Sequence, residues 1–228
     1  AVQNFFVFDT ISSFWLLLAL GAAISAHSWN GVQREVLAVS KATRPLSWIA
    51  ALIFLYSIIP TSIQPARAAY NLAQAYKYQL VDVTQETTYL SKGVALDTYG
   101  NLEYGYEAYD MYANNQVAVL AGKARVDAYQ ATLAILTENF TRYTYDARTA
   151  LYLAHVLSLA PLSVTIDQNL LAAALTRAIT ESPKRSQPWF ILTNLSISHA
   201  NTYPVGSAER AAGYAAAEDI LYKYIELV

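Results

Sequence analysis

Two long apolar runs without a charged residue dominate the first quarter of the chain. They span residues 11–26 and 46–63, and the five charged residues of positions 1–63 all lie outside them. At 1.5 Å per residue, roughly 20 apolar residues form a helix that crosses a hydrocarbon layer of about 30 Å. A buried core helix, the alternative, ordinarily carries a polar stripe every three or four residues. The few polar side chains of the second run are hydroxyls that can bond to their own helix. The runs therefore predict a membrane hairpin of two helices.

The segments around the two runs indicate how such a hairpin would be oriented. The connecting loop, residues 27–45, carries three cations and one carboxylate, while no cation precedes the first run. The positive-inside rule therefore places this loop in the cytoplasm and the residues after Ile63 outside. Pro60 and Pro65 are expected to end the second helix. Because the chain has no initial Met and no basic stretch before the first run, we expect a processed or truncated chain rather than a signal peptide.

From residue 64 onward the composition becomes that of a soluble domain, with 12 cations, 15 carboxylates and 17 of the 18 tyrosines. Apolar residues recur at spacings of three and four, and the alternation typical of strands is missing. We expect Asp146, Asp167 and Ser207 to be helix N-caps. The expected helices span residues 66–80, 84–97, 101–114, 116–139, 146–159, 166–181, 187–200 and 207–226. The predicted fold class is all-α: a hairpin of two transmembrane helices, 1–63, followed by a helical domain, 64–228.

A repeat is visible within these helices. Pro183 is followed six residues later by Trp189 and then by Leu192. A tetratricopeptide repeat uses this spacing to end one helix pair and open the next. Residues 93–109 and 214–220 show the same kind of pattern in degenerate form. They predict a TPR-like array, and the alternative is an irregular helical bundle, which lacks a concave face.

Composition excludes several kinds of chemistry. With no cysteine in 228 residues, disulfides, thiolate metal sites and cysteine nucleophiles are absent. The net charge of -2 leaves no basic face for nucleic acid. No P-loop, dinucleotide fingerprint or nucleophile elbow occurs. The three histidines, His27, His155 and His199, show no metal-ligand spacing and are expected to be boundary or packing residues.

Carboxylates, tyrosines and asparagines were the remaining candidates for function. Glu103 and Glu107 lie one turn apart near Asp110, and we expect a solvated acidic face rather than a catalytic pair. Asp9 is expected to cap the first helix rather than to form an outward-facing polar site. Two N-glycosylation patterns begin at Asn139 and Asn194. A dense group of tyrosines is expected mainly to pack between helices, with contact to a glycan or peptide as the alternative. These are Tyr70, Tyr76, Tyr78, Tyr99, Tyr104, Tyr106, Tyr109 and Tyr112. We assign no catalytic, cofactor-binding or metal-ligating residue and expect no cofactor.

Two stretches of the chain resemble a known family. The first contains Gln3-Asn4-Phe5-Phe6-Val7-Phe8-Asp9, and an apolar span, a basic loop and a second span ending in Ile63-Gln64-Pro65 follow it. The second is Ala95-Leu96-Asp97-Thr98-Tyr99-Gly100-Asn101-Leu102-Glu103. This order is similar to the C-terminal end of bacterial O-antigen ligase family membrane proteins that carry a trailing tetratricopeptide-like domain. The likeness is strongest over residues 2–20 and 90–106.

The resemblance implies a polytopic glycosyltransferase of the bacterial inner membrane. Proteins of this family move a glycan from an undecaprenyl diphosphate carrier to an acceptor outside that membrane, without a nucleotide sugar or a metal. Their catalytic arginines and histidine lie in an outer loop that nothing in this sequence matches, so this segment would support the reaction without performing it. The helical domain would lie on the outer face, where its groove could engage the glycan, the acceptor or a partner protein. Membrane lipid would surround the hairpin.

Two other interpretations stay open. One is a non-enzymatic, membrane-anchored TPR-like scaffold whose groove binds a peptide or protein partner. The other is an all-helical soluble domain that buries both apolar runs.

Overall fold

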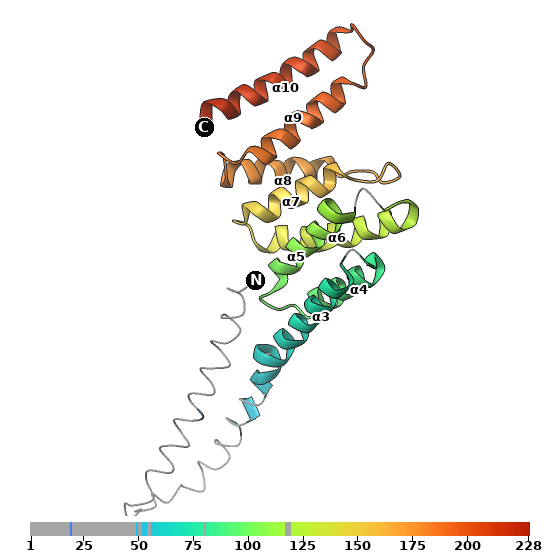
Figure 1. Ribbon diagram of the computed structural model, residues 1–228. Coiled ribbons are helices and arrows are strands. Elements are labelled where there is room, and N and C mark those ends of the chain that lie inside the picture. The colour runs from blue at the N-terminus through green and yellow to red at the C-terminus, as the bar shows by residue number, and fades with distance from the viewer. Residues whose placement is uncertain (1–18, 20–48, 50–51, 54–55, 80, 117–119) are drawn as a thin grey trace, which may run out of the picture. The chain divides into compact units, whose positions relative to one another are not determined.

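The computed structural model describes residues 19, 49, 52–53, 56–79, 81–116 and 120–228, and these form helices and turns without a strand (Figure 1). The predicted all-α class is confirmed for this part of the chain. The chain divides into two compact units, Ala1–Gln64 and Pro65–Val228. Most of the two expected hairpin spans, 11–26 and 46–63, lies outside the described residues. Among the residues that are described, no helix combines the length and the apolar character that crossing a membrane requires.

Pro60 and Pro65 do not end a helix, and the sequence-based expectation was wrong on this point. Pro60 lies in η2 (Ile59–Ile63), a π-helical turn, and α3 (Gln64–Tyr78) follows directly with Pro65 as its second residue. Proline lacks the N–H that the interior of an α-helix requires. A π-helical turn changes the local hydrogen-bond pattern and is a common way to accommodate such an interruption. At the junction the Gln64 N–H donates back to the Ile59 carbonyl oxygen, and Pro65, which has no N–H, comes directly after it.

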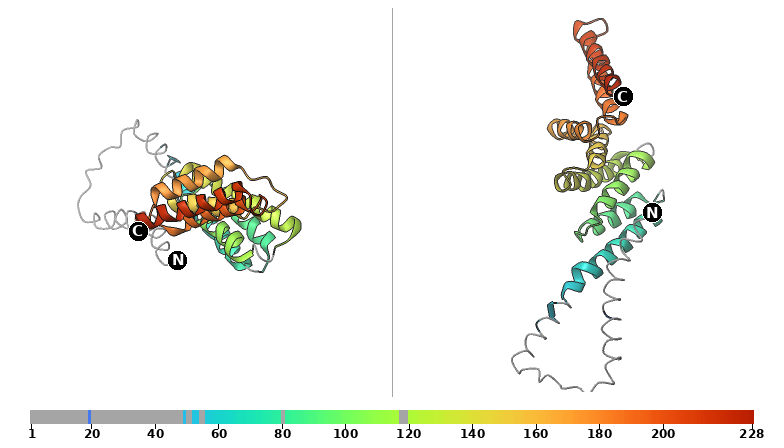
Figure 2. Two further views of the ribbon diagram at one scale, coloured as in Figure 1. Left: turned by 90° about the horizontal axis from the view of Figure 1, so that it is seen from above. Right: turned by 90° about the vertical axis from the view of Figure 1, so that its left-hand side faces the viewer.

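The second unit continues as a succession of helix pairs. After α3 come α4 (Val83–Val94), α5 (Asn101–Tyr109), η3 (Asp110–Gln116), α6 (Gly122–Arg142), α7 (Ala147–Ser158), α8 (Gln168–Glu181), α9 (Ser186–Ala200) and α10 (Ala208–Leu227). Helix α5 packs on α6, α7 on α8 and α9 on α10, and the pairs follow one another along the unit (Figure 1; Figure 2). The first helix of each pair also packs on the first helix of the next pair, α5 on α7 and α7 on α9.

The helix starts follow the capping chemistry of the sequence. Asp146, Asp167 and Ser207 are confirmed as N-caps, because each side chain accepts a hydrogen bond from a backbone N–H of the first turn. Asp82 caps α4 in the same way, a cap that sequence analysis missed. The helix expected over 116–139 begins later, at Gly122, whose φ of +55° favours glycine.

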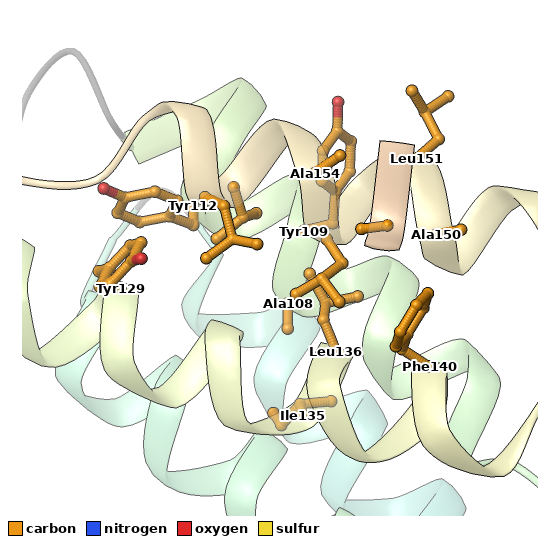
Figure 3. Packing of buried hydrophobic residues seen from close by; sticks show 14 of the residues in the cluster. Ala108, Tyr109, Tyr112, Tyr129, Ile135, Leu136, Phe140, Ala150, Leu151 and Ala154 are labelled. Atoms are coloured by element: carbon orange, nitrogen blue, oxygen red, sulfur yellow. The ribbon is translucent and has the colours of Figure 1, made fainter. Parts of the chain in front are cut away.

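Tyrosines fill much of the space between the helices. The side chains of Tyr104, Tyr112 and Tyr129 are fully buried. Tyr112 and Tyr129 meet edge to face with ring centroids 5.7 Å apart (Figure 3). The Tyr112 hydroxyl donates a hydrogen bond of 2.8 Å to the Leu159 carbonyl oxygen, so its burial leaves no polar atom unpaired. The expected packing role is confirmed for Tyr104 and Tyr112. Tyr70, Tyr76 and Tyr99 are exposed instead.

The stretch 95–103 forms the turn from α4 into α5 and holds three helices together. Its Asn101 is buried, and the Asn101 carbonyl oxygen accepts a hydrogen bond of 2.8 Å from Nδ2 of Asn139 on α6. Next to this turn, a Cβ added to Gly93 would lie 2.1 Å from the Tyr104 ring. This close approach requires glycine. The residues that carry the second family resemblance therefore have a structural function.

Candidate functional site

A cavity of about 480 Å³ is lined by the first helices of the three pairs. This volume lies in the range of small-molecule and cofactor binding sites. The α5 side contributes Tyr109 and, through η3, Asn114, while α7 contributes Tyr152 and His155. The remaining lining comes from α9 and the turn before it. The cavity thus depends on the stacking of successive pairs and would not exist on one pair alone.

Tyr109, Tyr152 and His155 form the wall of the cavity between α5 and α7. The Tyr109 hydroxyl lies 2.8 Å from Nδ1 of His155, and the Tyr109 ring stacks on Tyr152 with centroids 3.7 Å apart and planes 3° from parallel. Burial, followed by the neighbouring Tyr152 and Asp110, raises the pKa of Tyr109 to about 12. Burial also lowers the pKa of His155. Burial thus favours the neutral form of both side chains.

Arg185 supplies the charge of the cavity. It precedes α9, and its Nε donates a hydrogen bond of 2.9 Å to Oε1 of Gln187. Of the residues that line the cavity, Arg185 alone carries a formal charge when His155 is neutral, and no carboxylate is among them. None of the ion pairs found between described residues includes Arg185. The lining itself therefore carries one positive charge, while the carboxylate of Asp110, just outside the lining, accepts a hydrogen bond of 2.7 Å from Nδ2 of Asn114.

The α9 wall is amphipathic. Phe190 is 49% exposed and Asn194 is also exposed on this side, while Ile191 is half-buried between them. Trp189, the neighbour of Phe190, points inward and is buried. Successive helical residues are about 100° apart, so burying Trp189 leaves Phe190 on a different face. That relationship is the signal in the sequence that could have identified Phe190, which sequence analysis missed together with Arg185.

A second group of polar residues is buried where α4 and α5 meet. Glu86 on α4 is 0% exposed, and neither of its carboxylate oxygens has a hydrogen-bond partner among the described residues. Burial, followed by the nearby Glu107, raises the pKa of Glu86 to about 7. Glu107 on α5 accepts hydrogen bonds from Tyr76 and, at 3.4 Å, from Nε2 of Gln79. Burial raises the pKa of Glu107 as well.

This group corrects the expectation of a solvated acidic face. Glu103 is exposed as expected, but Glu107, one turn later, is 6% exposed. Glu107 lies at the spacing of the buried residues Tyr104 and Met111, so the helix carries it to the interior. Within the described part of the chain, no group of three acidic, histidine or cysteine side chains is arranged to hold a metal ion.

The other residues singled out from the sequence do not converge on one site. His199 lies on α9 near Tyr203, with Nε2 and the hydroxyl 3.4 Å apart, whereas His155 lines the cavity. Asn139 is buried in α6, so the folded chain cannot be glycosylated there, while Asn194 is exposed. Asp9 and His27 lie outside the described residues.

The cavity offers ring surfaces, amide groups and one guanidinium, and its histidine is hydrogen-bonded to a phenol rather than to a nucleophile or a carboxylate. No family model, curated protein or solved structure matches this chain.

Proposed function

We propose that this chain is the C-terminal part of a membrane-bound glycosyltransferase of the O-antigen ligase type, and that residues 64–228 are its TPR-like binding module. The enzyme would move a glycan from undecaprenyl diphosphate to an acceptor at the outer face of the bacterial inner membrane. The module would hold a substrate next to the transfer site. Catalysis itself is assigned to none of the described residues.

The cavity lined by α5, α7 and α9 is the observation that carries the binding role. Three successive helix pairs contribute to one concave site, and the stacking of first helix on first helix is how repeat arrays build binding surfaces. The site combines a guanidinium, amides and the exposed ring of Phe190, while Tyr109 and Tyr152 belong to the core or pack against it. These are the groups with which proteins orient polar ligands.

The transferase and membrane parts of the proposal have separate support. The resemblance over residues 2–20 and 90–106 supports the family. Within the expected second span, Ile49, Leu52 and Ile53 expose 53%, 63% and 65% of their surface. Exposed apolar side chains at three neighbouring helical positions are compatible with a lipid contact. The cations of the loop 27–45 favour the outer face for everything that follows the second span.

Disruption of the gene in the organism that makes this protein tests the proposed activity. The disrupted strain should accumulate undecaprenyl-diphosphate-linked glycan and lose the transferred glycan, both measured by mass spectrometry of extracted lipids and acceptors. Reintroducing the gene should restore transfer. A gene carrying Phe190→Ala together with Asn194→Ala should restore less transfer at an equal protein level, because the α9 wall of the cavity is altered.

Two results would contradict the proposal. An unchanged pool of lipid-linked glycan in the disrupted strain would exclude the transferase and leave the membrane-anchored scaffold for a peptide or protein partner. Digestion of residues 64–228 by protease in inverted vesicles but not in spheroplasts would exclude the outer face.

A further inference from the structure

We propose that the cavity binds an acidic oligosaccharide and that Arg185 holds a sugar carboxylate in it. This inference rests on the proposed function, because it names the class of ligand that the binding module takes. It concerns binding alone and includes no covalent step.

Charge complementarity selects an anionic group. Arg185 is half-buried, and the cavity lining contains no carboxylate to balance it. Its Nε is used by Gln187, which leaves the two terminal Nη groups to approach a ligand side by side. A guanidinium edge of this kind matches the two oxygens of a carboxylate. A neutral ligand would leave this partly desolvated charge without a partner.

The other lining groups suit a sugar. The exposed ring of Phe190 gives an apolar surface on which the C–H face of a pyranose can pack. Asn194 offers both a donor and an acceptor, as a sugar's hydroxyl groups do, and Asn114, whose Nδ2 already donates one hydrogen bond of 2.7 Å to Asp110, adds its amide oxygen as an acceptor. A neutral His155 that accepts the Tyr109 proton at Nδ1 carries its own proton at Nε2, which is then another donor. The volume of about 480 Å³ accommodates more than one sugar ring.

Binding of trigalacturonic acid to the 228-residue chain in detergent micelles tests the inference. The matched ligand is the same trisaccharide with all carboxyl groups methyl-esterified, which keeps the rings and removes the charge. Isothermal titration calorimetry should show that the acid binds more tightly than the ester. Arg185→Gln should weaken binding of the acid by roughly tenfold or more, as expected for a charge-assisted pair, and leave binding of the ester unchanged.

Two control variants separate the effect of this charge from other changes. Lys184→Gln removes the exposed neighbouring cation, which is outside the cavity lining, and should leave the affinity for the acid as it is. Phe190→Ala should weaken the binding of the acid and of the ester by the same factor, because it removes the ring surface on which either sugar would pack. Helical circular dichroism of each variant confirms that the chain is folded.

The inference is overturned if the folded chain binds the acid and the ester equally, or if Arg185→Gln leaves the affinity for the acid unchanged. It is also overturned if neither trisaccharide binds while hexaglutamate does, a result that assigns the cavity to an acidic peptide. None of these results affects glycan transfer in the gene-disruption experiment, so failure of this inference can be told apart from failure of the proposed function.

Discussion

The indole Nε1–H of Trp189 donates a hydrogen bond of 2.9 Å to the carbonyl oxygen of Pro183, six residues earlier. Trp189 is 8% exposed and lies in the first turn of α9, while Pro183 lies in the turn that follows α8. The bond fastens the start of one helix pair to the end of the previous one. The spacing of proline and aromatic residue noted in the sequence thus has a local physical cause.

Trp189→Phe should lower the free energy of unfolding by about 1–2 kcal/mol. The phenyl ring keeps most of the buried apolar surface, but the Pro183 carbonyl loses its donor. Thermal unfolding followed by circular dichroism measures the change. Tyr145→Phe, at an exposed position, is the control and should be neutral. Equal stability of Trp189→Phe and the parent chain would show that the bond contributes nothing.

Gly93→Ala should destabilise the helical unit by about 1–3 kcal/mol, although the same change at an open helical position is stabilising. The added methyl group would lie 2.1 Å from the Tyr104 ring, which is buried and cannot move aside without disturbing α5. Urea unfolding measures the loss. Ser91→Ala on the exposed face of α4 is the matched variant and should keep the parent midpoint. A stabilised Gly93→Ala would refute the close contact.

Asn139→Ala should lower the free energy of unfolding by about 1–3 kcal/mol, because it leaves the buried Asn101 carbonyl oxygen without its hydrogen-bond donor. Asn169→Ala, at an exposed position of α8, should change the free energy of unfolding by less than about 0.5 kcal/mol. Chemical unfolding of both variants under one set of conditions gives the comparison. The prediction fails if the two variants are equally stable.

Glu86→Gln should change how stability depends on pH. Burial holds the pKa of Glu86 at about 7 in the folded chain, above its ordinary value of 4.5. Between these values the folded chain binds more protons than the unfolded chain, so the free energy of unfolding falls as the pH rises from 4.5 through 7. The loss should amount to about 3 kcal/mol.

Thermal unfolding at pH 5, 6, 7 and 8 measures this contribution. Glutamine is neutral throughout, so Glu86→Gln should match the parent chain at pH 5 and be more stable than it at pH 8. Glu103→Gln removes an exposed carboxylate from α5 and should follow the parent curve. Parallel pH curves for the parent chain and Glu86→Gln would mean that Glu86 is already ionised in the folded state.

Periodicity and capping predicted the helices well because both are local. The apolar spacing located every helix from α3 to α10, and a carboxylate or hydroxyl before the apolar stripe identified three N-caps. Asp82 was missed although Gln85 follows it at capping-box spacing. The extension of α5 into a π-helix was not predicted, since nothing local distinguishes its residues from those of an α-helix.

The cavity could not be predicted in the same way, because it is made of residues far apart in the sequence. Tyr109 and His155 are 46 positions apart, and only the packing of α5 on α7 brings them together. The burial of Glu107 was a different kind of error. Its charge suggested solvent, while its helical position beside Tyr104 placed it inside, and packing outweighed polarity.

The last helix pair is attached to the rest of the unit more weakly than the others. None of the buried residues of α9 and α10 belongs to the main buried cluster, which only Ile191, Leu192 and Leu195 of that pair touch. Local opening of such an element requires less free energy than global unfolding. The helix pair that carries Phe190 should therefore open locally at a lower free energy than the rest of the unit. A ligand bound between α7 and α9 would oppose this opening and slow amide hydrogen exchange throughout α9 and α10.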